Sequence, residues 1–409
     1  MNVLQTFPLA ARALLRNKAR SLLTALGVVI GVASVISMVA IGEGAKAGVE
    51  QVFASMGTNL LIVTSGSSRA GGVMGGAGSM PSITWDDMRA IGSEASAVRA
   101  TAPQLQGRAS MVGDDANWNT QVVGTTPEYF DLRAWRIGGG TLFGHSDVEG
   151  GNKVIVLGRT TADKLFGENV DPEGRTVRIR NIPFVVIGVL AKKGQSPMGQ
   201  DYDDTAVMPY TTYSQKIQGG LQKFLGGQIL VGAVTSADTD RAEKQVASIL
   251  RDRHHINNPA DDDFQIRNLT EIASAQAQGT QTLTALLASI AIVSLLVGGI
   301  GIMNIMLVSV TERTREIGVR MAVGAKPWHV LAQFLVEAVT LSVAGGILGL
   351  GLGVGVAYGV AAKLGWNVVI RPDIVFVSIG FSALVGVGFG AYPAHKASRL
   401  DPIDALRFE

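Results

Sequence analysis

The stretch LTALLASIAIVSLLVGGIGIMNIMLVSV, residues 283–310, has no charged side chain and is long enough to cross a lipid bilayer. An α-helix rises about 1.5 Å per residue, so about 20 apolar residues span about 30 Å of hydrocarbon. Three further apolar stretches occupy residues 21–41, 330–362 and 374–392. The sequence therefore predicts an integral membrane protein with four transmembrane helices.

The composition of the 409 residues agrees with this class, since 47% are hydrophobic and only 17% are charged. The formal net charge of +2 is not the strongly basic balance of a nucleic-acid-binding protein, so no nucleic-acid partner is expected. The absence of cysteine excludes disulfides, thiolate metal sites and cysteine nucleophiles. Partners are expected in the membrane lipid and in other proteins.

The first apolar stretch, residues 21–41, has a rival interpretation as a signal peptide, because basic residues precede it and Ala45-Lys46-Ala47 imitates a cleavage site. Its apolar run is longer than the roughly 7–15 residues of a signal peptide, which favours a retained span. The large segment between the first two spans, residues 42–280, gives a 1+3 arrangement.

Basic residues near the span ends set the expected orientation, because they resist translocation. Most lie before the first span, between the second and third, and after the fourth: Arg12, Arg16, Lys18, Arg20, Arg313, Arg315, Arg320, Lys326, Lys396, Arg399 and Arg407. The other short loop has only Lys363 and Arg371. We expect both termini in the cytoplasm, with residues 1–20 as a juxtamembrane amphipathic helix, residues 393–409 as a tail, and residues 42–280 outside.

Residues 42–280 are predicted to form a mixed α+β domain. Short β-branched runs at residues 59–64, 153–157, 176–180 and 184–190 indicate strands. Helices are indicated after Thr84, a potential N-cap, and over residues 238–252. A strand-rich subdomain is expected at about residues 103–226.

The sequence offers no catalytic site and no cofactor site. It contains no G-x-x-x-x-G-K-[ST] phosphate loop, and the glycine-rich residues 66–79 are predicted to be a flexible loop. His254, His255 and the acidic residues 261–263 lack the spacing of a metal site and are interpreted as a solvated turn. The chain is therefore predicted not to be an enzyme by itself.

Glycines recur at helical spacing within the spans, where small residues let helix backbones approach closely. The first span has Gly27 and Gly31, and the later spans have Gly345, Gly349, Gly353, Gly351, Gly355, Gly359, Gly386 and Gly390. For the third and fourth spans we favour packing within one subunit over contact between subunits.

The segment TERTREIGVRMAVGA, residues 311–325, follows the second span. Thr311 is a potential N-cap, acidic residues lie in the first turn, Ile317 and Met321 form an apolar side, and Gly324 is placed to end the helix. Residues 311–327 are thus predicted to contain a short amphipathic helix. Composition alone favours a helix that lies on lipid headgroups.

This segment, preceded by NIMLVSV, resembles the coupling-helix region of MacB-type ABC transporter permeases, of the wider FtsX-like permease family. AYPAHKASRLDPIDALR, residues 391–407, is similar to the family's ending, and residues 13–36 resemble its first span. SMGTNLLIV, VIVLGRTTADKLFG, DPEGRTVRI and FVVIGVLAKKGQSPMGQDYDD resemble its periplasmic core domain. The motifs cover nearly the whole chain in the family's order.

The resemblance implies a homodimeric permease in the bacterial inner membrane, with a periplasmic domain and an ABC ATPase that binds ATP and Mg²⁺. The family's fused ATPase is absent before Met1, so a separate ATPase polypeptide is expected. The ATPase would drive a stroke of the periplasmic domain, or mechanotransmission, that exports drugs, peptides or other amphiphiles, with a possible periplasmic adaptor and outer-membrane channel. Lipoprotein release and non-transporting signalling to a cell-wall enzyme remain alternatives.

The family's coupling residues correspond here to Glu312, Arg313, Arg315, Glu316, Ile317, Arg320 and Gly324. By resemblance these residues are expected to dock on the ATPase. Gly27 and Gly31 fall where the family's first span lies near the dimer axis, so they are expected to face the second subunit.

Overall fold

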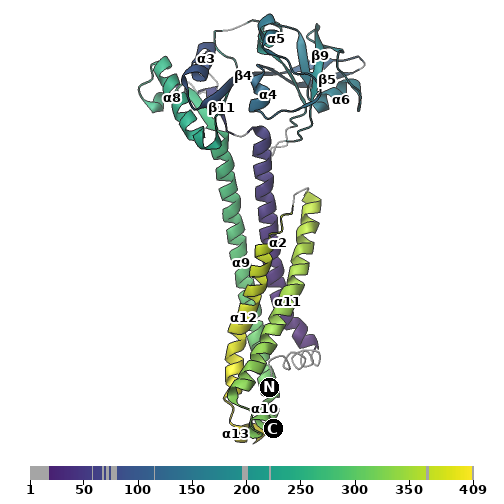
Figure 1. The fold of residues 1–409 in the computed structure, drawn as a ribbon, viewed down its shortest axis with the longest axis vertical. Coiled ribbons are helices and arrows are strands. Elements are labelled where there is room, and N and C mark those ends of the chain that lie inside the picture. The colour runs from purple at the N-terminus through teal and green to yellow at the C-terminus, as the bar shows by residue number, and fades with distance from the viewer. Residues whose placement is uncertain are drawn as a thin grey trace. The chain divides into compact units, whose positions relative to one another are not determined.

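The computed structural model describes residues 18–57, 59–66, 69–70, 73–74, 81–114, 116–195, 201–220, 223–364 and 368–407. The chain divides into two compact units. The helical unit is built from Met1–Gly48 and Ala277–Glu409, and the α+β domain is Val49–Gln276. The predicted class, four transmembrane helices with an α+β domain inserted after the first, is confirmed (Figure 1).

The long helices are α2 (Lys18–Met56), α9 (Leu269–Glu312), α11 (Pro327–Leu364) and α12 (Pro372–Ser398). Among the described residues, these four are long and apolar enough to cross a membrane. Each contains one predicted span and extends beyond it. The predicted juxtamembrane helix lies outside the described residues except for residues 18–20, which belong to α2. The predicted tail continues α12 to Ser398 and then forms α13 (Pro402–Arg407).

One apolar core joins the helices of the helical unit. It includes Val32 of α2, Leu295 and Met306 of α9, Phe334 of α11 and Val385 of α12, all nearly fully buried. Helices α11 and α12 run side by side (Figure 1). Because lipid tails are as apolar as these side chains, the gain from packing comes from close van der Waals contact.

The glycines of the first span pack within the subunit, so the expected contact with a second subunit is wrong for this face. A Cβ atom on Gly27 would lie 2.8 Å from the Cα of Gly298, and one on Gly31 would lie 2.9 Å from the Cα of Leu295. Both partners belong to α9 of the same chain. Helical periodicity identified the packing face but not its occupant.

The glycines of the later spans divide into two groups. Gly349 and Gly353 lie against α2, and Gly386 and Gly390 lie against α11, which confirms packing within the subunit for these positions. The Ser37 hydroxyl also donates to the Gly353 carbonyl at 2.9 Å. In contrast, a Cβ atom on Gly351, Gly355 or Gly359 would have no described atom within 4 Å.

The α+β domain contains a ten-stranded sheet in the order β12-β1-β11-β4-β5-β10-β7-β9-β6, with β8 pairing β4 and β9. The strands are β1 (Leu60–Ser65), β4 (Val98–Val112), β5 (Asn117–Thr125), β6 (Ile137–Gly140), β7 (Val154–Leu157), β8 (Thr176–Ile179), β9 (Ile182–Leu190), β10 (Thr205–Pro209), β11 (Gln228–Ala233) and β12 (Phe264–Asn268). The predicted strands at residues 59–64, 153–157, 176–180 and 184–190 correspond to β1, β7, β8 and β9.

Strand β4 belongs to both halves of this sheet. Its first part pairs with β11 up to Gln104, and its second part pairs with β5 from Leu105. The change of partner lies close to residue 103, where the sequence suggested that the strand-rich subdomain begins. A continuous strand, rather than a linker, connects the two halves.

The helices of the α+β domain are α3 (Trp85–Glu94), α4 (Glu128–Leu132), α5 (His145–Gly150), α6 (Arg159–Phe166), α7 (Tyr210–Tyr213) and α8 (Thr239–His254). Thr84 caps α3 as predicted, because its hydroxyl accepts from the Asp87 amide in a capping box. Residues 66–79 were predicted to form a flexible loop. Within them, β2 (Arg69–Ala70) pairs with β3 (Val73–Met74), and residues 67–68, 71–72 and 75–79 lie outside the described residues.

The contact between α2 and α9 leads to a stability prediction. We expect Gly298→Ala to lower the free energy of unfolding by about 1–3 kcal/mol, because its Cβ would lie 2.7 Å from the Gly27 carbonyl carbon. The control Gly301→Ala lies one turn further along α9 in open space and should be neutral or stabilising. Thermal unfolding in detergent measures both, and equal midpoints would contradict the assigned packing.

Candidate functional site

The predicted amphipathic helix is α10 (Thr314–Ala322), and it begins later than expected. Thr311 is not its N-cap, because α9 continues through Glu312 and the Thr311 hydroxyl donates to the Val308 carbonyl at 2.8 Å. The helix axis breaks at Arg313, whose φ of −103° and ψ of 14° are not helical. One residue therefore separates the second span from α10.

Gly324 ends α10 as predicted. Its φ of +102° is a conformation that side chains with a Cβ rarely adopt. The Gly324 amide donates to the Met321 carbonyl at 3.1 Å, and the Ala325 amide donates to the Arg320 carbonyl at 3.0 Å. These two bonds form a Schellman motif, which satisfies carbonyls at the end of the helix.

One side of α10 packs on the rest of the helical unit. Ile317 is buried in the apolar core, and a Cβ atom on Gly318 would lie 2.8 Å from the Cβ of Ala405 in α13. The C-terminal helix α13 thus packs directly against α10. Ile317 was predicted to face a partner protein, but the structure places it inside the subunit.

Two of the predicted coupling arginines also contact their own chain. Arg313 Nη1 lies 3.3 Å from Glu337 Oε2 of α11, and the Glu337 side chain is only 6% exposed. Arg320 Nη1 donates to Gln333 Oε1 at 2.8 Å, and Arg320 also pairs with Glu316. These contacts tie both ends of α10 to α11.

The opposite side of α10 is exposed and carries the remaining predicted residues. Glu312, Arg315 and Glu316 are exposed, and Val319 and Val323 continue this face at helical spacing, with Val323 85% exposed. Trp328 of α11 and Ile403 and Leu406 of α13 are also exposed. We call Arg315, Glu316, Val319 and the C-cap residue Val323 the exposed face of α10; Glu312, the last residue of α9, is exposed as well.

The apolar members of this surface were not identified from the sequence. The sequence indicated Ile317 and Met321 as the apolar side of the helix, and neither Val319 nor Val323 was singled out as part of a docking surface. A helical pattern shows which residues share a face, but α10 is short, and its two faces differ mainly in whether α11 and α13 cover them. The signal that was available is the i, i+4, i+8 spacing of Arg315, Val319 and Val323.

No metal site is found among the described residues, where no group of three or more His, Asp or Glu side chains could hold an ion. His254 nevertheless differs from its interpretation as part of a solvated turn. Its side chain is only 10% exposed and lies between Asp87 and Asp263. His255, in contrast, is exposed and has a φ of +57°.

Two family models match the chain over most of its length. The MacB-like periplasmic core domain matches residues 21–249, and the FtsX-like permease C-terminal region matches residues 288–402. The chain belongs to the MacB-like permease family. The second match contains α10 and ends within α13.

Relatives of this MacB-like permease carry the name macrolide export ATP-binding/permease protein MacB. One from Syntrophobacter fumaroxidans is 39% identical over 98% of this chain and 63% of its own length. One from Bdellovibrio bacteriovorus is 42% identical over 96% of this chain and 60% of its own length. The chain therefore spans about three-fifths of these relatives, and both matched family models describe permease regions.

A solved structure, the periplasmic region of MacB from Actinobacillus actinomycetemcomitans, is 24% identical and covers 54% of this chain and 94% of its own, with a TM-score of 0.44. The four apolar helices and the family place this MacB-like permease in the inner membrane.

The ion pair of Arg313 leads to a second prediction. Replacing Arg313 by Gln leaves the buried Glu337 carboxylate without its charged partner, so we expect a loss of about 1–3 kcal/mol in the free energy of unfolding. The control Arg315→Gln alters an exposed arginine two residues away and should change stability by less than about 0.5 kcal/mol. Thermal unfolding in detergent would contradict the assignment if both variants behaved alike.

Proposed function

We propose that this chain is the permease of a MacB-like ABC exporter, in which ATP binding and hydrolysis move the α+β domain and drive efflux of drugs, peptides or other amphiphiles. The relatives are named for macrolide export, and this name supports export as the activity. The proposed topology places both termini and α10 in the cytoplasm and the α+β domain in the periplasm, in line with the distribution of basic residues.

The observation that carries the proposal is the continuity of α9. This helix begins directly after β12 of the α+β domain and runs without a break to Glu312, one residue before α10. Its 44 residues extend about 66 Å, roughly twice the hydrocarbon thickness. An unbroken helix carries displacement along its axis, so a movement imposed at α10 reaches the strand that precedes α9.

The exposed face of α10 is proposed to dock on the ABC ATPase. Arg315 provides a charged donor of the type that is enriched at protein interfaces, and Val319 and Val323 provide exposed apolar area that an interface would bury. Arg313, Ile317 and Arg320 serve a different role in this proposal. Arg313 and Arg320 fasten α10 to α11, and Ile317 anchors α10 in the apolar core, so that a push on α10 also moves α11.

The proposed assembly further contains a second copy of the permease and, in a cell with two membranes, a periplasmic adaptor and an outer-membrane channel. Because Gly27 and Gly31 pack against α9 of their own chain, the contact between the two copies is proposed to use other surfaces. ATP and Mg²⁺ bind to the ATPase in this assembly.

The docking proposal predicts separate effects on assembly and folding. Arg315→Glu reverses an exposed charge on the docking face and should weaken ATPase binding by about tenfold, the effect of losing about 1.4 kcal/mol at an interface. Gly324→Pro removes the amide that donates to Met321 and should also uncouple ATP hydrolysis from export. Both variants should still insert in the membrane.

The measurement is copurification of the ATPase with tagged permease, followed by the ATPase rate of the complex. The control Lys363→Glu reverses an exposed basic charge at the other end of α11 and should behave like the wild type. Normal ATPase recovery and stimulation with Arg315→Glu would exclude the docking role. Recovery of an ATPase together with lipoproteins or a cell-wall enzyme would assign this coupling to lipoprotein release or to signalling.

A further inference from the structure

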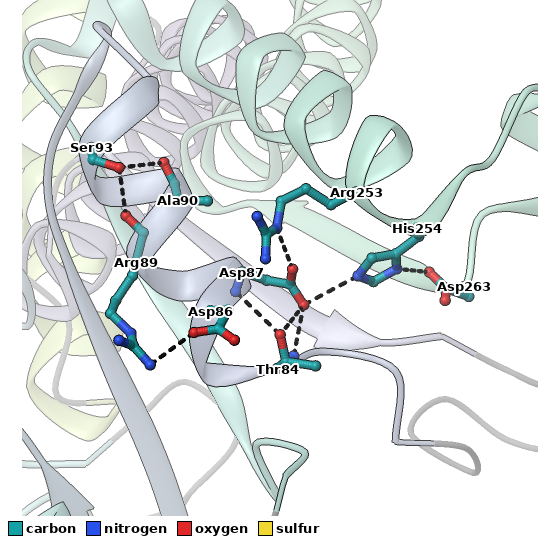
Figure 2. Close-up of polar contacts among 9 residues, drawn as sticks. All are labelled: Thr84, Asp86, Asp87, Arg89, Ala90, Ser93, Arg253, His254 and Asp263. Carbon is teal, nitrogen blue, oxygen red and sulfur yellow. Dashed lines mark hydrogen bonds and ion pairs between the residues drawn. The ribbon is translucent and has the colours of Figure 1, made fainter.

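A cluster of charged side chains lies where α3, α8 and the residues before β12 meet (Figure 2). It consists of Asp87 from α3, Arg253 and His254 from the end of α8, and Asp263. The Asp87 side chain is 3% exposed and the His254 side chain is 10% exposed. Charges this deeply buried are stable only when they are paired and hydrogen-bonded.

Asp87 is held as a carboxylate by several donors. Its Oδ2 accepts from the Thr84 amide at 2.8 Å and the Thr84 hydroxyl at 2.6 Å, and its Oδ1 accepts from Arg253 Nε at 2.6 Å. Burial by itself raises the pKa of Asp87, but the hydrogen bonds from Thr84 and Arg253 outweigh it and lower the pKa to about 2. Asp87 is therefore an acceptor throughout the neutral range.

His254 lies between two carboxylates and faces each with a different ring nitrogen (Figure 2). Nδ1 is 2.7 Å from Asp263 Oδ1, and Nε2 is 3.2 Å from Asp87 Oδ2. A neutral imidazole carries one N–H group, whereas the imidazolium carries two, and an ionised carboxylate only accepts. Both contacts are hydrogen bonds only when His254 is doubly protonated.

Arg251 and Asp86, the neighbouring charged residues on α8 and α3, pair with other side chains and do not take the place of the second proton on His254. Arg251 of α8 donates to both oxygens of Asp262, at 2.8 and 2.7 Å, and Asp86 of α3 pairs with Arg89 at 2.8 Å. Asp86 and Glu94 act on Arg253 rather than on His254. Arg253 balances one of the two carboxylates that face His254, so the protonated ring balances the other.

The surroundings favour the protonated ring overall. Burial lowers the pKa of His254, but the hydrogen bonds with Asp263 and Asp87 outweigh burial, so the pKa is raised above its ordinary value of about 6.5. A group whose pKa is raised by folding stabilises the folded state fully below its unfolded-state pKa. This stabilisation is lost as the pH rises through the folded-state value.

The cluster is connected to α9 through β12, since Asp263 directly precedes this strand and α9 directly follows it. The Asp263 carbonyl accepts from the Gly66 amide at 2.7 Å and the Ser82 hydroxyl at 2.6 Å. Strand β12 follows immediately, and its last residue, Asn268, accepts from the amides of Thr270 and Glu271 in the first turn of α9. Contacts that hold Asp263 therefore also hold the strand that leads into the long helix.

We propose that doubly protonated His254 holds Asp263, and with it β12, against helices α3 and α8, and that this contact depends on pH. We call the contact the latch. As the surroundings become alkaline, His254 loses one proton and therefore one of its two hydrogen bonds. One of the two carboxylates then faces the lone pair of an unprotonated ring nitrogen, to which it cannot hydrogen-bond. Asp263 and β12 then separate from α3 and α8 more often. The latch does not depend on which substrate the protein moves.

Amide hydrogen exchange of the full-length protein between about pH 6 and pH 9 tests the latch. After correction for the chemical exchange rate, the opening constant of residues 263–272 should rise at least about threefold toward alkaline pH in the wild type. His254→Gln cannot titrate and should abolish this pH dependence. The control His255→Asn changes the neighbouring exposed histidine, in a conformation that Asn accepts, and should retain the wild-type profile.

A second variant distinguishes a latch from a merely structural contact. Asp263→Asn keeps a hydrogen-bonding side chain but removes one negative charge, so the midpoint of the pH profile should move to lower pH. The ring-nitrogen NMR signals of His254 in the wild type report the same midpoint even if a variant fails to fold. A midpoint at or below about pH 6.5, or an unchanged pH profile in His254→Gln, would overturn the proposal.

Discussion

The close approach of α2 and α9 is the contact on which the helical unit depends. Lipid provides no hydrophobic drive between helices, so their association requires backbones that pack at van der Waals distance. Gly27 and Gly298 meet this requirement, and Gly349 and Gly353 bring α11 against a different side of α2, at Val29, Val32, Ala33 and Ile36. The chain enters the α+β domain through α2 and leaves it through α9. The two helices that connect the helical unit to that domain therefore share one packed core.

From this pairing, a continuous series of helices and strands follows the chain in both directions. Toward the C-terminus, α9 ends at a single non-helical residue, Arg313, whose side chain binds Glu337 and so joins α10 to α11. Toward the N-terminus of α9, Asn268 caps the helix and β12 carries the chain to Asp263. The same helix therefore connects the proposed ATPase contact to the charged cluster around His254. The two ends differ in chemistry, because one presents exposed side chains and the other buries ionised ones.

Local rules predicted the elements of this protein well. The length of the apolar stretches predicted the four spans, and short β-branched runs predicted β1, β7, β8 and β9. The glycine at position 324 predicted the end of α10, because glycine readily adopts the positive φ found there. The errors concern partners that are distant in sequence. Gly27 faces α9, Arg313 binds Glu337 and His254 is buried against Asp87, because a periodic pattern defines a face without naming what covers it. Thr311 was misplaced because the backbone hydrogen bonds of α9 continue past it, up to the bond from the Arg313 amide to the Ser309 carbonyl.

We propose that α9 transmits movement as one rigid element, and Gly279 offers a direct test because a Cβ atom there meets no described atom within 4 Å. Gly279→Pro would interrupt the helix, whereas Gly279→Ala would preserve it. Deuterium uptake of β12 should be measured in the permease–ATPase complex with and without ATP. If α9 is rigid, uptake changes with ATP in Gly279→Ala and does not change in Gly279→Pro. An equal ATP-dependent change in both variants would contradict it.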